Sequence, residues 1–556
     1  MIKFILTNVI VLTLMFFRRS GGFLTPTLYF EDGVTFLSQQ LQVDSWRLVF
    51  IPFTHGSLGD SYFLFLTRAI AYLTSKFPIE YAPYLMNGAG FLITSISISL
   101  FTLPVFRTVV KEDFLRIVFS ILTATVLDGG EFFGTTTNIF WPLGIVIVYY
   151  LLLPVSIDKS RAKIYYFKVI ALLIIAVSTP LSGLLLPFSF GKIILNRFKN
   201  SLPLVALSVG GAVEIFVNAL FSSPNVTEKY IPEISVLLIS LRNGFAHHVT
   251  LPMFFGYDVS KNLMKEQLGI DYFSGIMFII AVGILLTAKK DYRKFKIVSF
   301  LLIVCSLNYI LSFYKRDLWS FFYNLGETFF WDAPRYFFLS RVCLILVVFI
   351  LIDVIVFNRY FKSIFSVLLF SFLMLNNFKL KEDQPNSNLN WADHYSEIEA
   401  WLIDSHKDSA KQISVPVYPS PVWKMDLPPS NLGYSSRWNW GANIDLESDS
   451  VLLSKTNKLT WKDLLLSTSG PQRFVVSTQY HCNVPDHSNV IMKLTDSFGE
   501  QFESKMKYFK CGRIKNISVV LPGGGRRAVK ISFEYSGDRS VTLSDLRIES
   551  NSLNDS

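Results

Sequence analysis

Residues 29–36 read YFEDGVTF and place two adjacent carboxylates, Glu31 and Asp32, just after the first apolar segment of the chain. That segment, residues 4–17, is followed by two arginines and no small-residue cleavage site, so we predict an uncleaved first membrane helix. A long polar and aromatic loop, residues 20–81, then begins with the acidic pair. Ionisable pairs beside a bilayer are costly to keep, which makes this loop a candidate functional region.

The composition indicates a membrane protein with a soluble tail. Of 556 residues, 51% are hydrophobic and only 17% are charged, whereas soluble chains are about 25% charged. Residues 1–380 contain nearly all the long apolar runs, and the chain from 381 onward has the composition of a soluble protein. The net charge is +10, but lysine and arginine gather in short loops between apolar runs. That pattern indicates membrane topology rather than nucleic-acid binding.

The basic clusters predict which loops face the cytoplasm. They comprise Arg107, Lys111 and Arg116; Lys159, Arg161 and Lys163; Lys192, Arg197 and Lys199; Lys289, Lys290, Arg293, Lys294 and Lys296; and Arg359 and Lys362. About eleven spans agree with these loops, at 4–19, 82–106, 114–129, 138–156, 164–180, 181–196, 202–222, 272–288, 295–314, 336–357 and 362–379. We predict a cytoplasmic N-terminus, an external tail, and interfacial amphipathic helices at 61–75 and 234–256.

The tail is predicted to have two parts. Residues 381–470 form an extracytoplasmic α/β linker region, and short alternating runs from 471 to 556 predict a small β-sandwich. Cys482 and Cys511 lie in this sandwich. They either form a disulfide, as an external location favours, or are two unrelated free thiols.

Further polar residues share the predicted outer face with the acidic pair. They are Asp128, Glu131, Asn138 and Trp141 in one turn, Arg68 in the first loop, and Arg335 and Tyr336 at the start of a late span. The turn residues suit a substrate cavity, although Asp128 is equally a solvated loop residue. The two arginines suit a phosphate group, since a guanidinium fork matches its oxygens; Arg335 is equally a snorkelling anchor. Glu31 or Asp32 is equally a helix cap.

Short motifs in the membrane region resemble the GT-C superfamily of polytopic glycosyltransferases, including the serotype-converting O-antigen glucosyltransferases of bacteria. The motifs are Tyr29-Phe30-Glu31-Asp32-Gly33, Gly59-Asp60-Ser61-Tyr62 with Thr67-Arg68-Ala69, Glu131 with Thr137 to Trp141, Ser182-Gly183 with Leu186-Pro187, Arg335-Tyr336-Phe337, and a tail with Trp391 and Pro419 to Trp423. One departure is that Tyr29-Phe30 stands where the family usually has Trp-Ala.

The resemblance implies a membrane enzyme that transfers a sugar from an undecaprenyl-phosphate donor to a glycan such as lipid-linked O-antigen. It implies an acidic base in the first outer loop, at Asp32 or Glu31, and a donor phosphate held by basic residues, which we assign to Arg68 and Arg335. The expected location is a bacterial inner membrane with a periplasmic tail, with or without a divalent metal. The sequence has no glycine-rich nucleotide loop and no cytosolic domain for a nucleotide sugar. The alternatives are a glycan or lipid flippase and a non-catalytic membrane scaffold.

Overall fold

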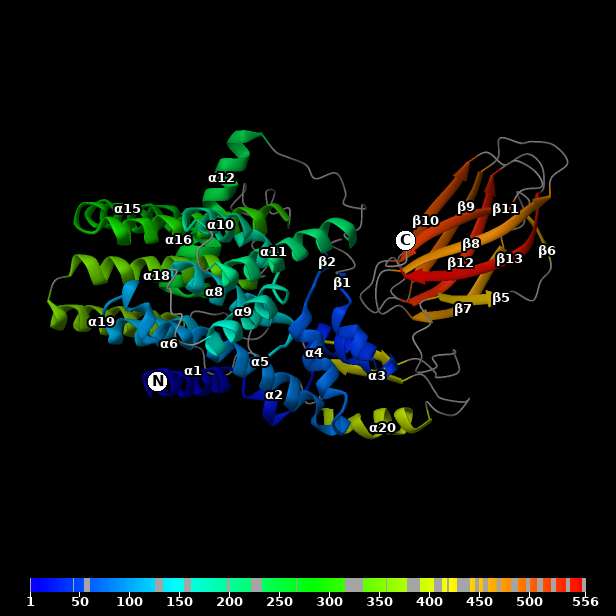
Figure 1. Cartoon of the computed structure of the whole chain (residues 1–556), viewed down its shortest axis with the longest axis horizontal. Coiled ribbons are helices and arrows are strands. Elements are labelled where there is room, and N and C mark those ends of the chain that lie inside the picture. The colour runs from blue at the N-terminus through cyan, green and yellow to red at the C-terminus, as the bar shows by residue number, and fades with distance from the viewer. Residues whose placement is uncertain are drawn as a thin grey trace.

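Helices dominate the first two thirds of the chain, and strands form the rest (Figure 1). The computed structural model describes residues 2–43, 45–54, 61–125, 134–154, 162–197, 201–221, 233–266, 268–315, 334–356, 358–377, 391–404, 413–417, 420–427 and the strands between 441 and 552.

The helical part is built around α18, Phe338–Ile355, whose side chains are buried from Phe338 to Asp353 apart from Val348. A helix that is apolar on all sides needs neighbours on all sides, and α18 packs against helices from both halves of the helical part. The other long helices are α1 Ile2–Arg18, α5 Ala82–Ser99, α6 Asp113–Thr125, α8 Phe140–Leu152, α9 Ala162–Ala176, α10 Leu181–Leu195, α11 Leu202–Phe221, α12 Ile234–Phe245, α15 Leu268–Lys290, α16 Tyr292–Lys315 and α19 Arg359–Asn377.

Five described helical segments are long and apolar enough to cross a membrane: Ile79–Thr102, Leu202–Phe221, Leu268–Lys290, Tyr292–Tyr314 and Arg335–Ile355. The least buried of them, Leu268–Lys290, carries large apolar side chains on its surface, since Phe278, Ile279 and Leu285 of α15 are 70–71% exposed. Such a surface suits lipid rather than water. The chain is therefore a mostly helical membrane protein.

The predicted count of eleven spans is not reached in the described chain. Four further apolar helices, Thr137–Leu152, Tyr165–Ala176, Leu181–Leu195 and Tyr360–Leu375, have only 10–17 residues, fewer than the roughly 20 that a spanning helix needs. The apolar runs in the sequence are longer than these helices because they include turns at the helix ends. Pro180, for example, separates α9 from α10, and Pro187 lies inside α10.

The first loop folds into short elements rather than an open loop. These are α2 Gly21–Leu24, the π-helix η1 Asp32–Leu37, α3 Ser38–Val43, the 3-10 helix η2 Trp46–Phe50, β1 Phe53–Thr54, β2 Ser61–Tyr62 and α4 Phe65–Thr74. The predicted interfacial segment 234–256 similarly divides into α12, the π-helix η8 Ala246–Thr250 and α13 Leu251–Phe255, and neither α4 nor this segment qualifies as a span.

Part of the tail packs onto the first loop. The hairpin of β3 Ile413–Val417 and β4 Ser420–Leu427 buries Val417 and Met425 against Leu28 and Phe36 of the loop, in one apolar core. A 3-10 turn and α20, Tyr395–Asp404, precede the hairpin. Trp391 in that turn donates from its main-chain N–H to Pro26 O (2.8 Å) and from Nε1 to Ile79 O (2.9 Å). The tail thus holds the loop that carries the acidic pair.

The C-terminal strands form two antiparallel sheets that make a separate lobe in Figure 1. The strands are β5 Gly441–Asp445, β6 Ser450–Leu453, β7 Leu459–Ser467, β8 Gln472–His481, β9 Asn489–Asp496, β10 Gln501–Lys507, β11 Ile514–Leu521, β12 Arg527–Ser536 and β13 Val541–Ser552. One sheet has the order β10-β9-β12-β7; the other has the order β11-β8-β13-β5, with β6 also paired to β13.

The predicted boundary of the sandwich at residue 471 is too late. Strands β5, β6 and β7 lie before it, yet they pair with β13 and β12. Residues 381–470 are therefore not a single linker region, because their second half belongs to the sheets. Cys482 and Cys511 lie outside the described residues, so their predicted pairing stays a prediction.

Candidate functional site

A cavity of about 160 Å³ lies where the first loop meets the ends of several helices. Five residues singled out in the sequence line it: Glu31, Asn138, Trp141, Arg335 and Tyr336. Three segments that are more than 100 residues apart in sequence thus contribute to one site. The remaining walls come from β1, β2, α10 and α16.

Glu31 lies immediately before the π-helix η1 and is 9% exposed. Among the described lining residues it is the one carboxylate. Its neighbour Asp32 is the first residue of η1 and forms hydrogen bonds away from the cavity. This is expected, because adjacent residues do not share a helix face. Glu31 is therefore the acidic group that the cavity presents to a ligand.

Arg335 lines the same cavity as Glu31 and is held by two tyrosines. Its Nη1 donates to Tyr29 Oη (3.3 Å), its Nη2 donates to Tyr336 Oη (3.4 Å), and its guanidinium carbon lies 5.1 Å from the centre of the Tyr336 ring. Burial raises the pKa of the Tyr29 phenol, the charge of Glu31 raises it further, and Arg335 opposes both effects. Tyr29 thus lies in the field of both groups, which brings an acid and a cation to one place.

Trp141 and Tyr336 form an aromatic wall of the cavity, with ring centres 5.5 Å apart and planes at 84°. Trp141 is buried, and its Nε1 has no hydrogen-bond partner in the part of the chain that the structure describes. Two polar side chains of α16 hold the main chain of Tyr336, since Asn308 Nδ2 and Ser312 Oγ each donate to Tyr336 O at 3.1 Å. The wall therefore offers a flat apolar surface with an available N–H donor, an arrangement that suits an oxygen-rich ring.

Asp32 is withdrawn from the cavity and is fully buried. Its Oδ1 accepts from Thr137 N (2.7 Å), Thr136 Oγ1 (2.6 Å) and Thr137 Oγ1 (2.6 Å), and its Oδ2 accepts from Thr136 N (2.8 Å). Burial raises the pKa of the Asp32 carboxyl, and these four donors oppose the shift. Asp32 thus serves as a cap, but for the 3-10 turn η7 Thr137–Ile139 and not for its own helix. Asp32, one of the two residues predicted as the base, therefore positions the turn beside the cavity.

Arg68 also lies apart from the cavity. Its Nη1 donates to Gln39 Oε1 (3.0 Å), its Nη2 donates to Pro52 O (3.3 Å), and it lies over the Phe36 ring at 5.3 Å. Burial lowers the pKa of Arg68 to about 9. The predicted phosphate-binding role is not supported by this placement, because both partners belong to the first loop and the arginine braces that loop from inside.

The remaining predicted residues divide in two groups. Asn138 lines the cavity, and its Nδ2 donates to Thr135 Oγ1 (2.9 Å). Asp128 and Glu131 lie outside the described residues, so their place in the cavity stays a prediction.

Sequence reasoning missed two kinds of contributor. Tyr29 belongs to the motif of residues 29–33, but nothing in that motif indicates that its phenol accepts a hydrogen bond from Arg335. Asn308 and Ser312 are spaced by four residues in an apolar helix, and that spacing places two polar groups on one face. This pattern was a usable signal.

A metal ion does not suit the donors present. Among the described residues no three histidine, cysteine or acidic side chains gather to hold one, and Asp32, which would complete a pair with Glu31, is already occupied by four donors. Among the described lining residues, the available chemistry is one carboxylate, one guanidinium and an aromatic wall.

No family model, no curated protein and no solved structure matches this chain.

Proposed function

We propose that the protein is a glycosyltransferase of the GT-C type, which moves a sugar from a polyprenyl-phosphate donor to a hydroxyl of a glycan acceptor. The supporting observation is that Glu31 and Arg335 line one cavity beside the Trp141–Tyr336 wall. An inverting transfer needs one base for the acceptor and one cation for the leaving phosphate, and this pair supplies one of each.

The reaction proceeds in a single displacement. The acceptor oxygen attacks the anomeric carbon from the face opposite the phosphate, and Glu31 takes the proton of that hydroxyl. The bond between the anomeric carbon and the phosphate oxygen breaks, and its electrons stay on the phosphate, where Arg335 stabilises the added charge. The products are the glycoside, the polyprenyl phosphate and a protonated Glu31.

A lipid-linked donor suits the surroundings of the cavity. Leu181, Leu184 and Leu311 form part of its lining, and Leu311 is 42% exposed on a spanning helix. The cavity wall therefore continues onto an apolar surface that a polyprenyl chain can follow. The volume of about 160 Å³ is smaller than the roughly 300–1,000 Å³ of pockets for drug-sized ligands, so it corresponds to the transferred unit and not to a whole glycan. We assign acceptor binding to the external tail.

A flippase is the second candidate, because ionisable residues are buried within spanning helices, among them Glu214 and Arg341. Glu214 of α11 accepts from Phe63 N at 3.1 Å, and Arg341 of α18 donates to His248 O at 2.6 Å. Both contacts attach a helix to the backbone of a neighbouring segment. They therefore favour a structural role, and the transferase remains the better proposal.

The test is a transfer assay with the purified protein in vesicles that contain undecaprenyl-phosphate glucose labelled in the sugar, with extracted lipid-linked O-antigen as acceptor. We expect label in the glycan with the wild type and a loss of about 100-fold or more with Glu31→Gln, the typical effect of removing a general base. Glu80→Gln, which changes an exposed carboxylate of the same region, is the matched control.

Two results would contradict the proposal. One is a Glu31→Gln protein that is folded and retains transfer within a factor of about ten. The other is movement of the labelled donor across the vesicle membrane without any new glycosidic bond, which is the result that the flippase predicts. Loss of transfer in the control as well would show that the assay reports stability rather than chemistry.

A further inference from the structure

A second hollow, of about 520 Å³, lies at the far end of the helical part from the candidate site. The helix α18 connects the two, because Arg335 and Tyr336 precede its start and Asp353 and Val354 lie near its end. Those positions are on the order of 25 Å apart along a helix, close to the roughly 30 Å of a bilayer core. The hollow thus lies near the membrane surface opposite the candidate site.

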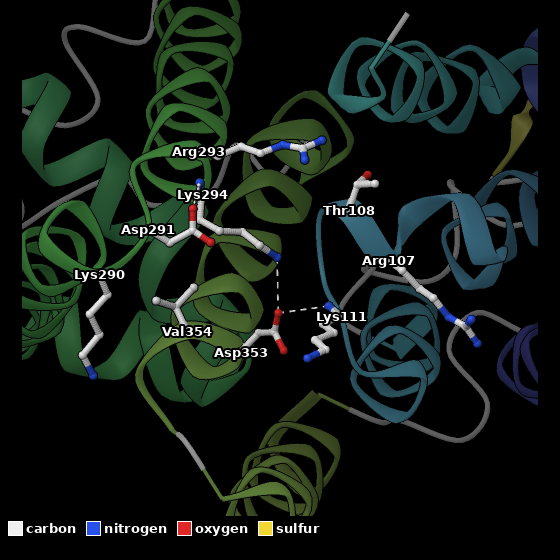
Figure 2. Close-up of a pocket in the computed structure, with 9 residues that line it drawn as sticks. All are labelled: Arg107, Thr108, Lys111, Lys290, Asp291, Arg293, Lys294, Asp353 and Val354. Carbon is white, nitrogen blue, oxygen red and sulfur yellow. Dashed lines mark hydrogen bonds and ion pairs between the residues drawn. The ribbon is translucent and has the colours of Figure 1, made fainter. Parts of the chain in front are cut away.

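Basic residues dominate the lining of this hollow. They are Arg107, Lys111, Lys290, Arg293 and Lys294, against the two acids Asp291 and Asp353. Two loops that the sequence predicts on the cytoplasmic side therefore come together here. Figure 2 shows the two sets projecting from different walls, Arg107 and Lys111 from one side and Lys290, Arg293 and Lys294 from the other.

Both acids are already engaged within the protein. Asp353 pairs with Lys294 (3.3 Å) and with Lys362 (3.2 Å), and its Oδ2 also accepts from Lys111 N (2.9 Å). Asp291 Oδ1 accepts from Lys294 N (3.0 Å), at the start of α16. Two lysine ammonium groups thus balance Asp353, and Asp291 accepts from a main-chain N–H.

Two of those cations have no partner in the described part of the chain. Arg107 is bound to Asp113 (2.9 Å), but neither Lys111 Nζ nor the Arg293 guanidinium makes a hydrogen bond or ion pair with another described residue. Both side chains are exposed and line the same hollow. Like charges held around one concave space favour an anion between them.

The surface beside the hollow is apolar along one helix face. Val282, Leu286 and Lys290 of α15 are spaced by four residues and so share a face. Val282 and Leu286 are 39% and 41% exposed, and Lys290 lines the hollow. A ligand with an anionic head and an acyl chain uses both features, whereas a free phosphate ion uses only the first.

We propose that this hollow binds the head group of an anionic phospholipid, with its phosphate between Lys111 and Arg293 and an acyl chain along Val282 and Leu286. Basic pockets between membrane helices commonly hold such head groups. The volume of about 520 Å³ is sufficient for a phosphoglycerol group. The site is independent of the sugar-transfer proposal, since it involves none of the same residues.

The test compares lipid adducts of the full-length protein by native mass spectrometry, with phosphatidylglycerol and phosphatidylcholine offered at equal concentration. We expect a preference of about tenfold or more for phosphatidylglycerol. The double variant Lys111→Gln with Arg293→Gln should lose about 30-fold in binding, because each basic residue at an anionic surface contributes roughly a factor of five. The control, Lys168→Gln with Lys289→Gln, removes the same charge from exposed positions outside the lining and should keep the adduct.

Three outcomes would overturn the proposal. The first is an adduct that the double variant retains as well as the control does. The second is equal binding of the two lipids. The third is displacement of phosphatidylglycerol by an excess of inorganic phosphate at constant ionic strength, since this would assign the hollow to a soluble anion. All four substituted side chains are exposed, so we expect the variants to fold.

Discussion

The substitution Asp32→Asn should loosen the turn at residues 135–139 without removing any group from the cavity. An asparagine whose oxygen takes the place of Oδ1 keeps three of the four hydrogen bonds, but as neutral bonds. Each change from a charged to a neutral acceptor lowers the stability of the turn by about 1 kcal/mol. The lost hydrogen bond of Thr136 N–H, which would face the amide N–H₂ of the asparagine, costs about another 1–3 kcal/mol. Relief from burying a charge offsets part of this, which leaves about 3 kcal/mol.

Hydrogen–deuterium exchange of the peptide that covers the turn measures this effect directly. A loss of 3 kcal/mol increases the opening constant of the Thr136 and Thr137 amides by about 100-fold, because local opening governs their exchange. Glu31→Gln, one residue away, should leave the exchange of these amides unchanged within a factor of about three, since Glu31 makes none of these four bonds. Unchanged exchange in Asp32→Asn would refute the reasoning and would indicate that the native carboxyl is protonated.

Three further predictions follow from other residues. Arg335→Lys should lower kcat of sugar transfer by about 100-fold while the protein stays folded, because a single ammonium group cannot reproduce the guanidinium fork. An unchanged kcat would exclude a role of Arg335 at the leaving phosphate. Gly90→Ala should destabilise the protein by about 1–3 kcal/mol, because the added Cβ would lie 2.9 Å from Thr135 N. The control Gly88→Ala places its Cβ in open space, so it should leave the thermal midpoint unchanged or raise it. Burial lowers the pKa of His247 to about 3, whereas an unfolded histidine has a pKa of about 6.5. The free energy of unfolding should therefore fall by up to about 2 kcal/mol between pH 6.5 and pH 5, where only the unfolded chain takes up the proton. A thermal midpoint of His247→Gln with the same pH dependence as the wild type would contradict this.

The class of the fold was predictable because apolar runs report burial or lipid contact directly. Their number does not report the number of crossings, since a run also includes the turns at its ends, as at Pro180. The strands from β8 onward were largely predictable from alternation. The earlier strands β5 and β7 were not, because GANID contains Gly, Asn and Asp, which are depleted in strands, and LTWKDLLLS lacks a strict period of two.

The residues of the candidate site were partly predictable, but the separate roles of Glu31 and Asp32 were not. Residues near Glu31, Trp141 and Arg335 were singled out because polar and aromatic groups beside a span are unusual. The choice between Glu31 and Asp32 depends on Thr136 and Thr137, which follow Asp32 by 104 and 105 residues. A single sequence contains no information on that contact, and so the two carboxylates were equivalent until their partners were known.

The attachment of the tail to the first loop has a consequence for biosynthesis. Trp391 follows its partner Ile79 by 312 residues. At a synthesis rate of 5–20 residues per second, the first loop is therefore made roughly 15–60 s before Trp391. During that interval Leu28 and Phe36 lack the hairpin residues that later cover them. A chain terminated between residues 378 and 390 would therefore contain all five described candidate membrane helices and still present an incomplete first loop to quality-control proteases.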